Sequence, residues 1–340
     1  MTLSRLPLAC TAMFVAALAG FAAPAGAADA TTAAPPGRMD ITPLADDYFV
    51  PERFKGKTVL VTGGARGIGR MSAIRASREG AHVVVADILE KEGNATVAEI
   101  VAGGGKAIFV RADVRSTEDC DRMVAEAVKA FGSLDVALNS AGVMDAVPPA
   151  DAVDLASQRD KIFAPIHEAT DEYWQTTLDV NATGIFKSMR SQLRQMLKQG
   201  RGGSIVNIGS IAGLIGLAGN PAYVASKHAV TGITRNGAID YAPYGIRVNS
   251  VNMAATETPM TDAAFRKVRA VQQERSANPA LAAMPNMGML KTQSLLMFAD
   301  SKNRMSTPAE QAAVILFLLS PEASNITGAT WATDGGWTAY

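Results

Sequence analysis

The stretch Val61-Thr62-Gly63-Gly64-Ala65-Arg66-Gly67-Ile68-Gly69-Arg70 leaves a run of β-branched residues and enters a helical pattern. Glycines in such a turn let the backbone approach a pyrophosphate, whose charge is held by free N–H groups and by the positive end of the helix dipole. A P-loop is excluded, because the turn lacks Gly-Lys-Ser/Thr. The turn therefore predicts a dinucleotide-binding site that includes Gly63, Arg66, Gly67, Ile68 and Gly69.

Strand and helix patterns alternate from Lys57 to the end of the chain, which is typical of βαβ units around a parallel sheet. The continuous apolar run Val83-Val84-Val85 suits a strand that is covered on both faces. We expect one doubly wound α/β domain with seven parallel strands, at 58–61, 82–86, 107–110, 135–138, 204–208, 247–251 and 330–333. The expected helices are at 67–78, 90–101, 117–131, 171–198, 221–241 and 307–319.

The composition limits the partners and the kinds of site that this chain can have. The 340 residues are 48% apolar and 19% charged, and Lys+Arg and Asp+Glu number 32 each, so no net charge attracts nucleic acid. The cysteines Cys10 and Cys120 cannot build a disulfide framework, and the three histidines are scattered along the chain. We therefore expect no metal site, and a small-molecule substrate handled by an organic cofactor and ordinary side chains.

The N-terminal region has the pattern of a secretory signal. Arg5 precedes an apolar run at 6–23, and Ala25 and Ala27 form an A-x-A cleavage pattern. We expect a signal peptide at 1–30, a linker at 31–54 and the catalytic domain at 55–340. The enzyme would then be exported, without stable membrane association once the leader is cleaved. Two alternatives are an uncleaved membrane anchor and translation from Met39, which would give a cytoplasmic protein.

An acidic residue bears on the choice of cofactor. Asp87 ends the second predicted strand 18 residues after Gly69, about where a carboxylate meets the adenosine ribose hydroxyls. That carboxylate accepts a hydrogen bond from a 2′-hydroxyl and repels a 2′-phosphate, which favours NAD. Arg66 favours NADP instead, because a guanidinium beside the loop can pair with the 2′-phosphate. We therefore expect NAD, with NADP as the weaker alternative.

Four motifs together resemble the short-chain dehydrogenase/reductase family. They are Thr62-Gly-Gly-Ala-Arg-Gly-Ile-Gly69, Asn139-Ser-Ala-Gly142, Ser210 and Tyr223-Val-Ala-Ser-Lys227, in the family's order and approximate spacing. The resemblance covers essentially residues 55–340. It implies a Rossmann-type fold and an NAD(P)-dependent oxidoreductase that interconverts a secondary alcohol and a ketone.

The chemistry gives the catalytic candidates their roles. Oxidation of an alcohol needs a base for the hydroxyl proton, and a tyrosine with a pKa near 10 is a poor base at neutral pH. Lys227 lies one helical turn after Tyr223, so we expect its ammonium to favour the phenolate. Ser210 follows the fifth strand and is placed to bond the substrate oxygen. The resemblance implies that Asn181 positions a water in a proton relay behind the lysine.

The resemblance also implies further cofactor contacts. After the third strand it places the adenine at Asp113 and Val114, and after the sixth strand it places the nicotinamide amide at Thr258. Met253-Ala254 stands where the family usually has Pro-Gly, and Ala254 cannot easily adopt a positive φ. Besides binding through Tyr223 and Lys227, we expect the cofactor to be bordered after the fourth strand by Asn139, Ala141 and Gly142.

Two segments are unusually long. Residues 143–166 are expected to border the active site, and about 255–306 to form a helical lid over the substrate. Methionine is an adaptable liner for apolar ligands, which favours a bulky apolar or alicyclic substrate, but these residues can equally pack the lid onto the domain. The seven methionines near this segment are Met253, Met260, Met284, Met287, Met289, Met297 and Met305.

Two rival functions stay open at this stage. The same tyrosine can serve an epimerase or a dehydratase of the same fold, and a non-catalytic nucleotide-binding protein can keep the fold without turnover. The complete set of Ser210, Tyr223 and Lys227 argues against the second rival. The resemblance further implies a homotetramer joined through the helices predicted at 171–198 and 221–241.

Overall fold

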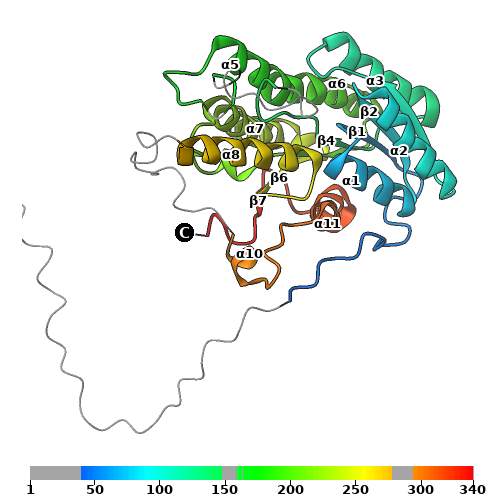
Figure 1. Ribbon diagram of the computed structural model, residues 1–340. Helices are drawn as coiled ribbons and strands as arrows, with labels where there is room; N and C mark the ends of the chain where they lie inside the picture. The colour runs from blue at the N-terminus through cyan, green and yellow to red at the C-terminus, as the bar shows by residue number, and fades with distance from the viewer. Residues whose placement is uncertain (1–39, 148–157, 159, 163, 278–293, 340) are drawn as a thin grey trace, which may run out of the picture. The chain divides into compact units, whose positions relative to one another are not determined.

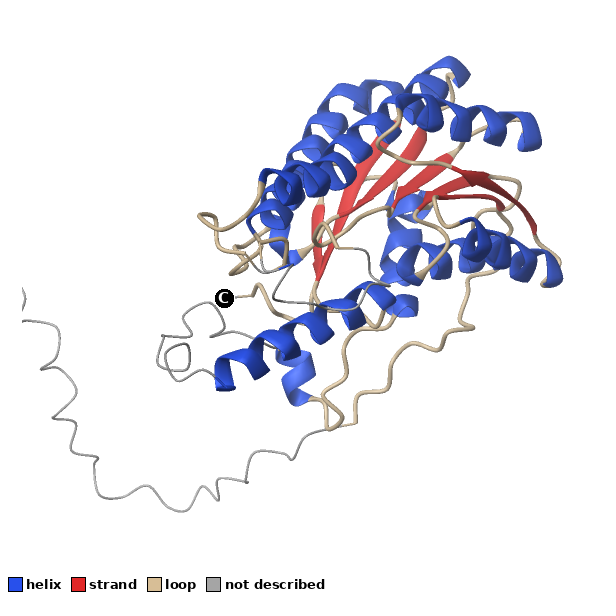
Figure 2. Cartoon of the chain, turned by 45° about the horizontal axis from the view of Figure 1, so that its top comes forward, coloured by secondary structure: helices blue, strands red, loops and turns tan. Residues whose placement is uncertain are grey.

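A sheet of seven strands occupies the centre of the structure (Figure 2). This computed structural model describes residues 40–147, 158, 160–162, 164–277 and 294–339. All strand pairs are parallel, in the order β3-β2-β1-β4-β5-β6-β7, as the sequence predicts. Because the order reverses between β1 and β4, a crevice opens beyond their carboxyl ends. The strands are β1 Thr58–Thr62, β2 His82–Asp87, β3 Lys106–Arg111, β4 Val136–Asn139, β5 Gly203–Ile208, β6 Ile246–Met253 and β7 Thr330–Thr333.

Helices cover both faces of the sheet (Figure 1). Alternate strand residues point to opposite faces, so Val61 joins the core under α1 and α11, while Leu60 joins the core under α3, α6 and α7. This two-sided burial confirms a single doubly wound α/β domain. The helices are α1 Gly67–Arg78, α2 Glu90–Ala102, α3 Thr117–Phe131, α5 Asp171–Leu178, α6 Gly184–Gln199, α7 Pro221–Tyr241, α8 Pro259–Ala277, α10 Leu295–Ala299 and α11 Pro308–Leu319.

The helix predicted at 171–198 is not one regular helix. A π-helical turn, Asp179–Thr183, separates α5 from α6 and contains Asn181. Gly184 follows it at a tight contact, since a Cβ there would lie 2.6 Å from Val114 Cγ2. The apolar period of the sequence predicts helix on both sides, but it carries no signal for the extra residue in the turn.

The end of β6 shows the effect of Met253-Ala254. The strand continues to Met253, two residues beyond the prediction, and Met253 pairs with Thr333 of β7. A proline at this place could not donate a ladder hydrogen bond, whereas methionine can. Among the described residues only Glu52 and Asn303 are non-glycine residues with positive φ, so Ala254 carries no such strain.

Residues 40–54, predicted as part of a linker, contain neither helix nor strand but are attached to the domain. Ile41 N donates to Asp300 Oδ2 at 3.1 Å, and Arg304 Nε donates to the Ile41 carbonyl at 2.8 Å. Phe54 is buried in the core next to α1. The compact unit therefore begins at Asp40. The signal peptide expected at 1–30, the rest of the linker and Met39 lie outside the described residues.

The segment predicted as a lid contributes α8 and α10. Residues 278–293, between these two helices, lie outside the described part, as do 148–157 of the other long segment. None of the helices in the described ranges is both long and apolar enough to cross a bilayer.

Candidate active site

Two loops meet closely at the crevice between β1 and β4. Gly63, directly after β1, has a φ of +65°, and a Cβ there would lie 2.7 Å from Ala141 N in the loop after β4. The Thr62 hydroxyl accepts hydrogen bonds from Ser140 N at 3.1 Å and Ala141 N at 3.3 Å. A Cβ on Gly69 would lie 2.2 Å from the Gly63 carbonyl oxygen. Only glycine fits at both positions, because the backbone itself fills the space.

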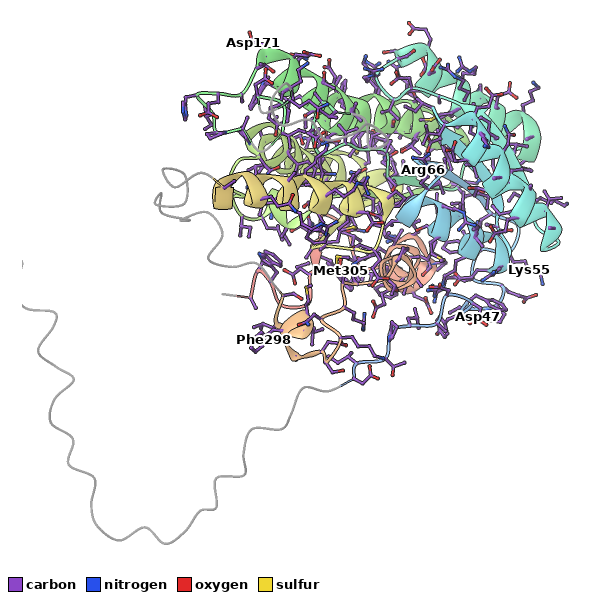
Figure 3. The ribbon with its side chains drawn as sticks, in the orientation of Figure 1. Asp47, Lys55, Arg66, Asp171, Phe298 and Met305 are labelled. Atoms are coloured by element: carbon purple, nitrogen blue, oxygen red, sulfur yellow. The ribbon has the colours of Figure 1, made fainter. Side chains whose placement is uncertain are left out.

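The start of α1 fits a pyrophosphate. Arg66 occupies the N-cap position (Figure 3) but makes no capping hydrogen bond with its side chain, so the first N–H groups of α1 have no capping partner. Such a helix terminus, next to a glycine turn, is the donor set that anionic groups require. Ile68 packs against the core, and a Cβ on Gly67 would lie 3.2 Å from Thr258 Cγ2. The structure thus brings Thr258 to the glycine turn.

Asp87 lies at the end of β2, beside the same turn. Its two carboxylate oxygens accept from Ala65 N and Leu89 N, each at 3.0 Å, which fixes the carboxylate next to the glycine turn. Arg66 pairs with Glu92, in the first turn of α2, and this bond lowers the pKa of Glu92. No sequence motif includes Glu92. The only signal for it is its position near the start of the helix that follows Asp87.

The adenine-side candidates are held by neighbouring groups. Arg115 bonds the Asp113 carboxylate at 2.6 Å and lowers its pKa, while Val114 is buried against Gly184.

The side chain of Asn139 does not border the crevice. It lies in the core, where it donates to Gln192 at 3.1 Å and to Asn207 at 2.9 Å. Asn139 can therefore border a cofactor only with its backbone, because its amide is used to join β4 to β5 and α6.

Ser210, Tyr223 and Lys227 come together beyond the end of β5. Ser210 caps the short 3₁₀ helix Ile211–Gly213, while Tyr223 and Lys227 lie in the first two turns of α7. Ser210 lowers the pKa of the Tyr223 phenol, and Lys227 Nζ lies 5.6 Å from the centroid of the tyrosine ring. The lysine also donates to the Ile208 carbonyl oxygen at 2.9 Å. All three side chains are at least nine-tenths buried.

Burial dominates the electrostatics of this group. It raises the pKa of Tyr223, and the hydrogen bond from Ser210 opposes that rise. Burial also lowers the pKa of Lys227 to about 8. In the structure Ser210 lowers the tyrosine pKa, while the Lys227 ammonium donates to a backbone carbonyl. The effect of Lys227 on the tyrosine pKa stays a prediction. The arrangement can still transfer a proton among the Tyr223 phenol, the Ser210 hydroxyl and the Lys227 amine.

Asn181 anchors the loop after β4. Its Oδ1 accepts from Val143 N and its Nδ2 donates to the Val143 carbonyl, both at 2.8 Å, and Nδ2 also bonds Ser226 Oγ at 3.0 Å. A Cβ on Gly142 would lie 3.1 Å from Asn181 Oδ1 and 3.8 Å from Lys227 Nζ. A side chain at Gly142 would therefore crowd the Asn181 amide beside the lysine. The water relay predicted for Asn181 stays a prediction.

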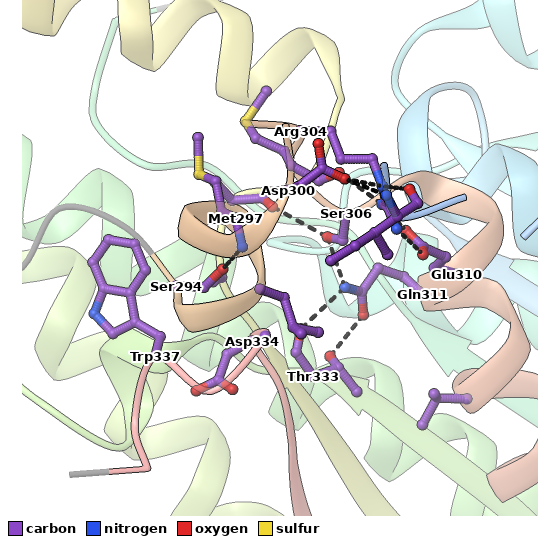
Figure 4. Close-up of a pocket in the computed structure, with 17 residues that line it drawn as sticks. Ser294, Met297, Asp300, Arg304, Ser306, Glu310, Gln311, Thr333, Asp334 and Trp337 are labelled. Carbon is purple, nitrogen blue, oxygen red and sulfur yellow. Dashed lines mark hydrogen bonds and ion pairs between the residues drawn. The ribbon is translucent and has the colours of Figure 1, made fainter. Parts of the chain in front are cut away.

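A pocket of about 220 Å³ lies beyond β6 and β7, between α10 and α11 (Figure 4). Met297, Met305 and Trp337 line it, and Ile41 borders it. Met253 is instead part of the core under α11. Met253 thus packs the domain as expected, whereas the lining of a substrate by the other methionines stays a prediction, because none of Ser210, Tyr223 and Lys227 lines this pocket. The methionines outside the described residues are Met284, Met287 and Met289.

Comparison with known proteins agrees with this geometry. A model of the family described as short chain dehydrogenase matches residues 57–269. The chain is 38% identical to the 3beta-hydroxysteroid dehydrogenase of Mediterraneibacter gnavus, over 86% of this chain and 98% of that one. It is 39% identical to the 2,5-dichloro-2,5-cyclohexadiene-1,4-diol dehydrogenase of Sphingobium indicum, over 84% and 98%. A short chain dehydrogenase from Mycobacterium paratuberculosis bound to NAD aligns with a TM-score of 0.70 and 28% identity, over 85% and 100%.

The lowered pKa of Lys227 predicts a pH dependence of stability. The folded protein releases this proton near pH 8, whereas an unfolded lysine holds it to a pKa of about 10.4. Between these values the unfolded chain binds more protons, so the free energy of unfolding rises with pH by about 3 kcal/mol relative to Lys227→Met. Urea unfolding of both proteins from pH 7.5 to 10.5 measures this difference. Equal slopes for wild type and Lys227→Met would contradict it, and the exposed Lys198→Met serves as the control.

Proposed function

The chain belongs to the short-chain dehydrogenase family, and from that premise we propose that it oxidises an alicyclic secondary alcohol to its ketone with NAD, or reduces the ketone with NADH. The observation that carries the proposal is the buried group of Ser210 and Tyr223, with Lys227 one turn further along α7. The glycine turn and the uncapped start of α1 supply a matching cofactor site.

The residues divide the chemistry between them. When bound, NAD would supply the acceptor for the hydride that leaves the alcohol carbon. As the tyrosinate, Tyr223 takes the hydroxyl proton while the carbonyl forms and becomes the neutral phenol, and in reduction the phenol returns that proton to the oxygen. Ser210 holds the reacting oxygen while its charge changes. Lys227 supplies a buried positive charge below pH 8, which favours the tyrosinate while the proton is away.

The names of the relatives support a ring-containing substrate. The relatives named above are called dehydrogenases of a hydroxysteroid and of a cyclohexadiene-diol, both of which carry the hydroxyl on a ring. An epimerase or a dehydratase would use the same tyrosine without net production of NADH, so the relatives' names favour the dehydrogenase.

Replacing Tyr223 with phenylalanine tests the assignment. We expect kcat for cyclohexanol with NAD to fall by about 10³-fold, because the proton acceptor is lost while the ring still packs. NADH fluorescence should show cofactor binding within a few-fold of wild type. The exposed Tyr244→Phe is the matched control. Turnover of Tyr223→Phe within tenfold of wild type would remove this tyrosine from the mechanism.

A preference for NAD follows from the charges near the ribose. Asp87 is fixed beside the turn, and Glu92 neutralises Arg66, the cation that would otherwise favour a 2′-phosphate. In Asp87→Asn we expect kcat/KM with NADP to rise about tenfold relative to NAD, because one repulsive charge is removed. Glu92→Gln should add to the effect by freeing Arg66. An unchanged ratio in both variants would refute the preference, and the exposed Asp47→Asn is the control.

We also propose that the enzyme is exported and forms a homotetramer. The residues at 1–30 carry the charge, apolar run and A-x-A pattern of a signal. Large apolar side chains are exposed on α5, α6 and α7 and on the edge strand β7, which favours association through these elements. They are Trp174, Phe186, Leu197, Ile239 and Trp331.

One measurement tests both parts. Native mass spectrometry of protein made with its leader should give four subunits, each lighter than the 35.5 kDa chain by the mass of the leader. Monomers would refute the tetramer. Subunits that keep Met1, or that begin at Met39, would refute export with cleavage.

A further inference from the structure

Helix α8 carries a buried lysine on its inward face. Lys267 lies four residues after Ala263, on the same side of the helix, and both are buried. Lys267 Nζ contacts the two carboxylate oxygens of Asp145 at 2.8 and 2.6 Å. The two side chains are 5% and 12% exposed. This ion pair thus joins two residues that are 122 positions apart in the sequence. A buried site of this kind is more often filled by apolar side chains than by charges.

The position of α8 relates this pair to the cofactor crevice. The Thr258 hydroxyl caps α8 by accepting from Thr261 N, and Thr258 lies beside Gly67 in the turn after β1. Asp145 belongs to the loop after β4. The helix therefore extends from one side of the β1/β4 crevice to the other. Figure 1 shows one end of α8 near β1 and α1.

The loop that holds Asp145 also reaches the catalytic group. Asp145 Oδ1 accepts from Val147 N at 2.9 Å, while Val143, two residues earlier, is bonded to Asn181 through both its N–H and its carbonyl. Tyr173 of α5 lies close by: burial, and then the charge of Asp145, raise its pKa to about 12. One short loop therefore connects α8 to Asn181.

The buried ion pair holds α8 against the loop after β4. Exposed pairs contribute little to stability, but a desolvated pair is stable only while both partners meet in good geometry. Separating Lys267 from Asp145 requires water to reach both charges, which means that α8 must move away from the loop. The helix is then either paired and closed or hydrated and open.

We propose that the Lys267–Asp145 ion pair is a latch that holds α8 closed over the cofactor crevice, and that its opening controls the release of NADH and the entry of the alcohol. The part that concerns the alcohol rests on the proposed function. Lys267 and Asp145 are positioning residues, because they act through α8 and the loop after β4.

The experiment compares Lys267→Met, Lys267→Arg and Asp145→Asn with wild type. We expect NADH to dissociate about tenfold faster from Lys267→Met in stopped-flow fluorescence, and KM for cyclohexanol to rise by a similar factor. Lys267→Arg keeps the charge and should stay within threefold of wild type. Lys129→Met removes one partner of the exposed pair with Glu126 and serves as the matched control.

A double variant separates loss of the latch from misfolding caused by one unpaired buried charge. Asp145→Asn/Lys267→Met leaves no unpaired buried charge, and we expect it to release NADH as fast as either single variant, since the same latch is lost in each. Hydrogen exchange should increase in α8 in all three charge-removing variants and remain unchanged in α3. NADH release within twofold of wild type in the double variant, or unchanged exchange in α8, would overturn the latch.

The two proposals fail separately. NADH release and hydrogen exchange need no turnover, so they test the latch even if cyclohexanol is not a substrate. If the wild-type protein binds NADH but oxidises no ring alcohol, the proposed substrate class is refuted. NADH release and hydrogen exchange then still decide whether the latch exists. If the wild type does not bind NADH, the proposed function fails and hydrogen exchange of α8 alone decides on the latch.

Discussion

The close approach of the loops after β1 and β4 is the constraint on which the site depends. Gly63 leaves no room for a Cβ against Ala141, and the Thr62 hydroxyl holds the second loop through two backbone N–H groups. This contact sets the width of the crevice at the point where the strand order reverses. A larger residue at Gly63 would move the loop that contains Gly142, and with it the space between Asn181 and Lys227.

Behind the crevice, buried amides join the strands to the helices that carry the catalytic group. Asn207 of β5 accepts from Asn139 of β4 at 2.9 Å and donates to Thr234 of α7 at 3.0 Å, while Gln192 of α6 donates to Asn139 at 2.8 Å. A buried network in which each amide is bonded resists displacement, because any shift leaves polar groups unpaired. The network therefore keeps α7, and Tyr223 upon it, in a fixed position relative to β5.

The residues of the site could be predicted because their chemistry is local. A glycine turn between strand and helix, and a tyrosine and a lysine four residues apart, constrain each other over short distances, so the sequence alone places them. Asn139 shows the limit of that reasoning. Its motif indicates a place beside the cofactor, but the direction of its side chain depends on Gln192 and Asn207, which lie 53 and 68 residues away in the sequence.

The sequence by itself determined the seven parallel strands, the family resemblance and the positions of Ser210, Tyr223 and Lys227, since periodicity and motif spacing are properties of neighbouring residues. Only the tertiary structure decided the π-helical turn at Asn181, the pairing of Arg66 with Glu92 and the burial of Lys267 against Asp145. Each of these depends on which distant side chain fills the space or neutralises the charge. That choice is made when the elements pack together, and no local pattern encodes it.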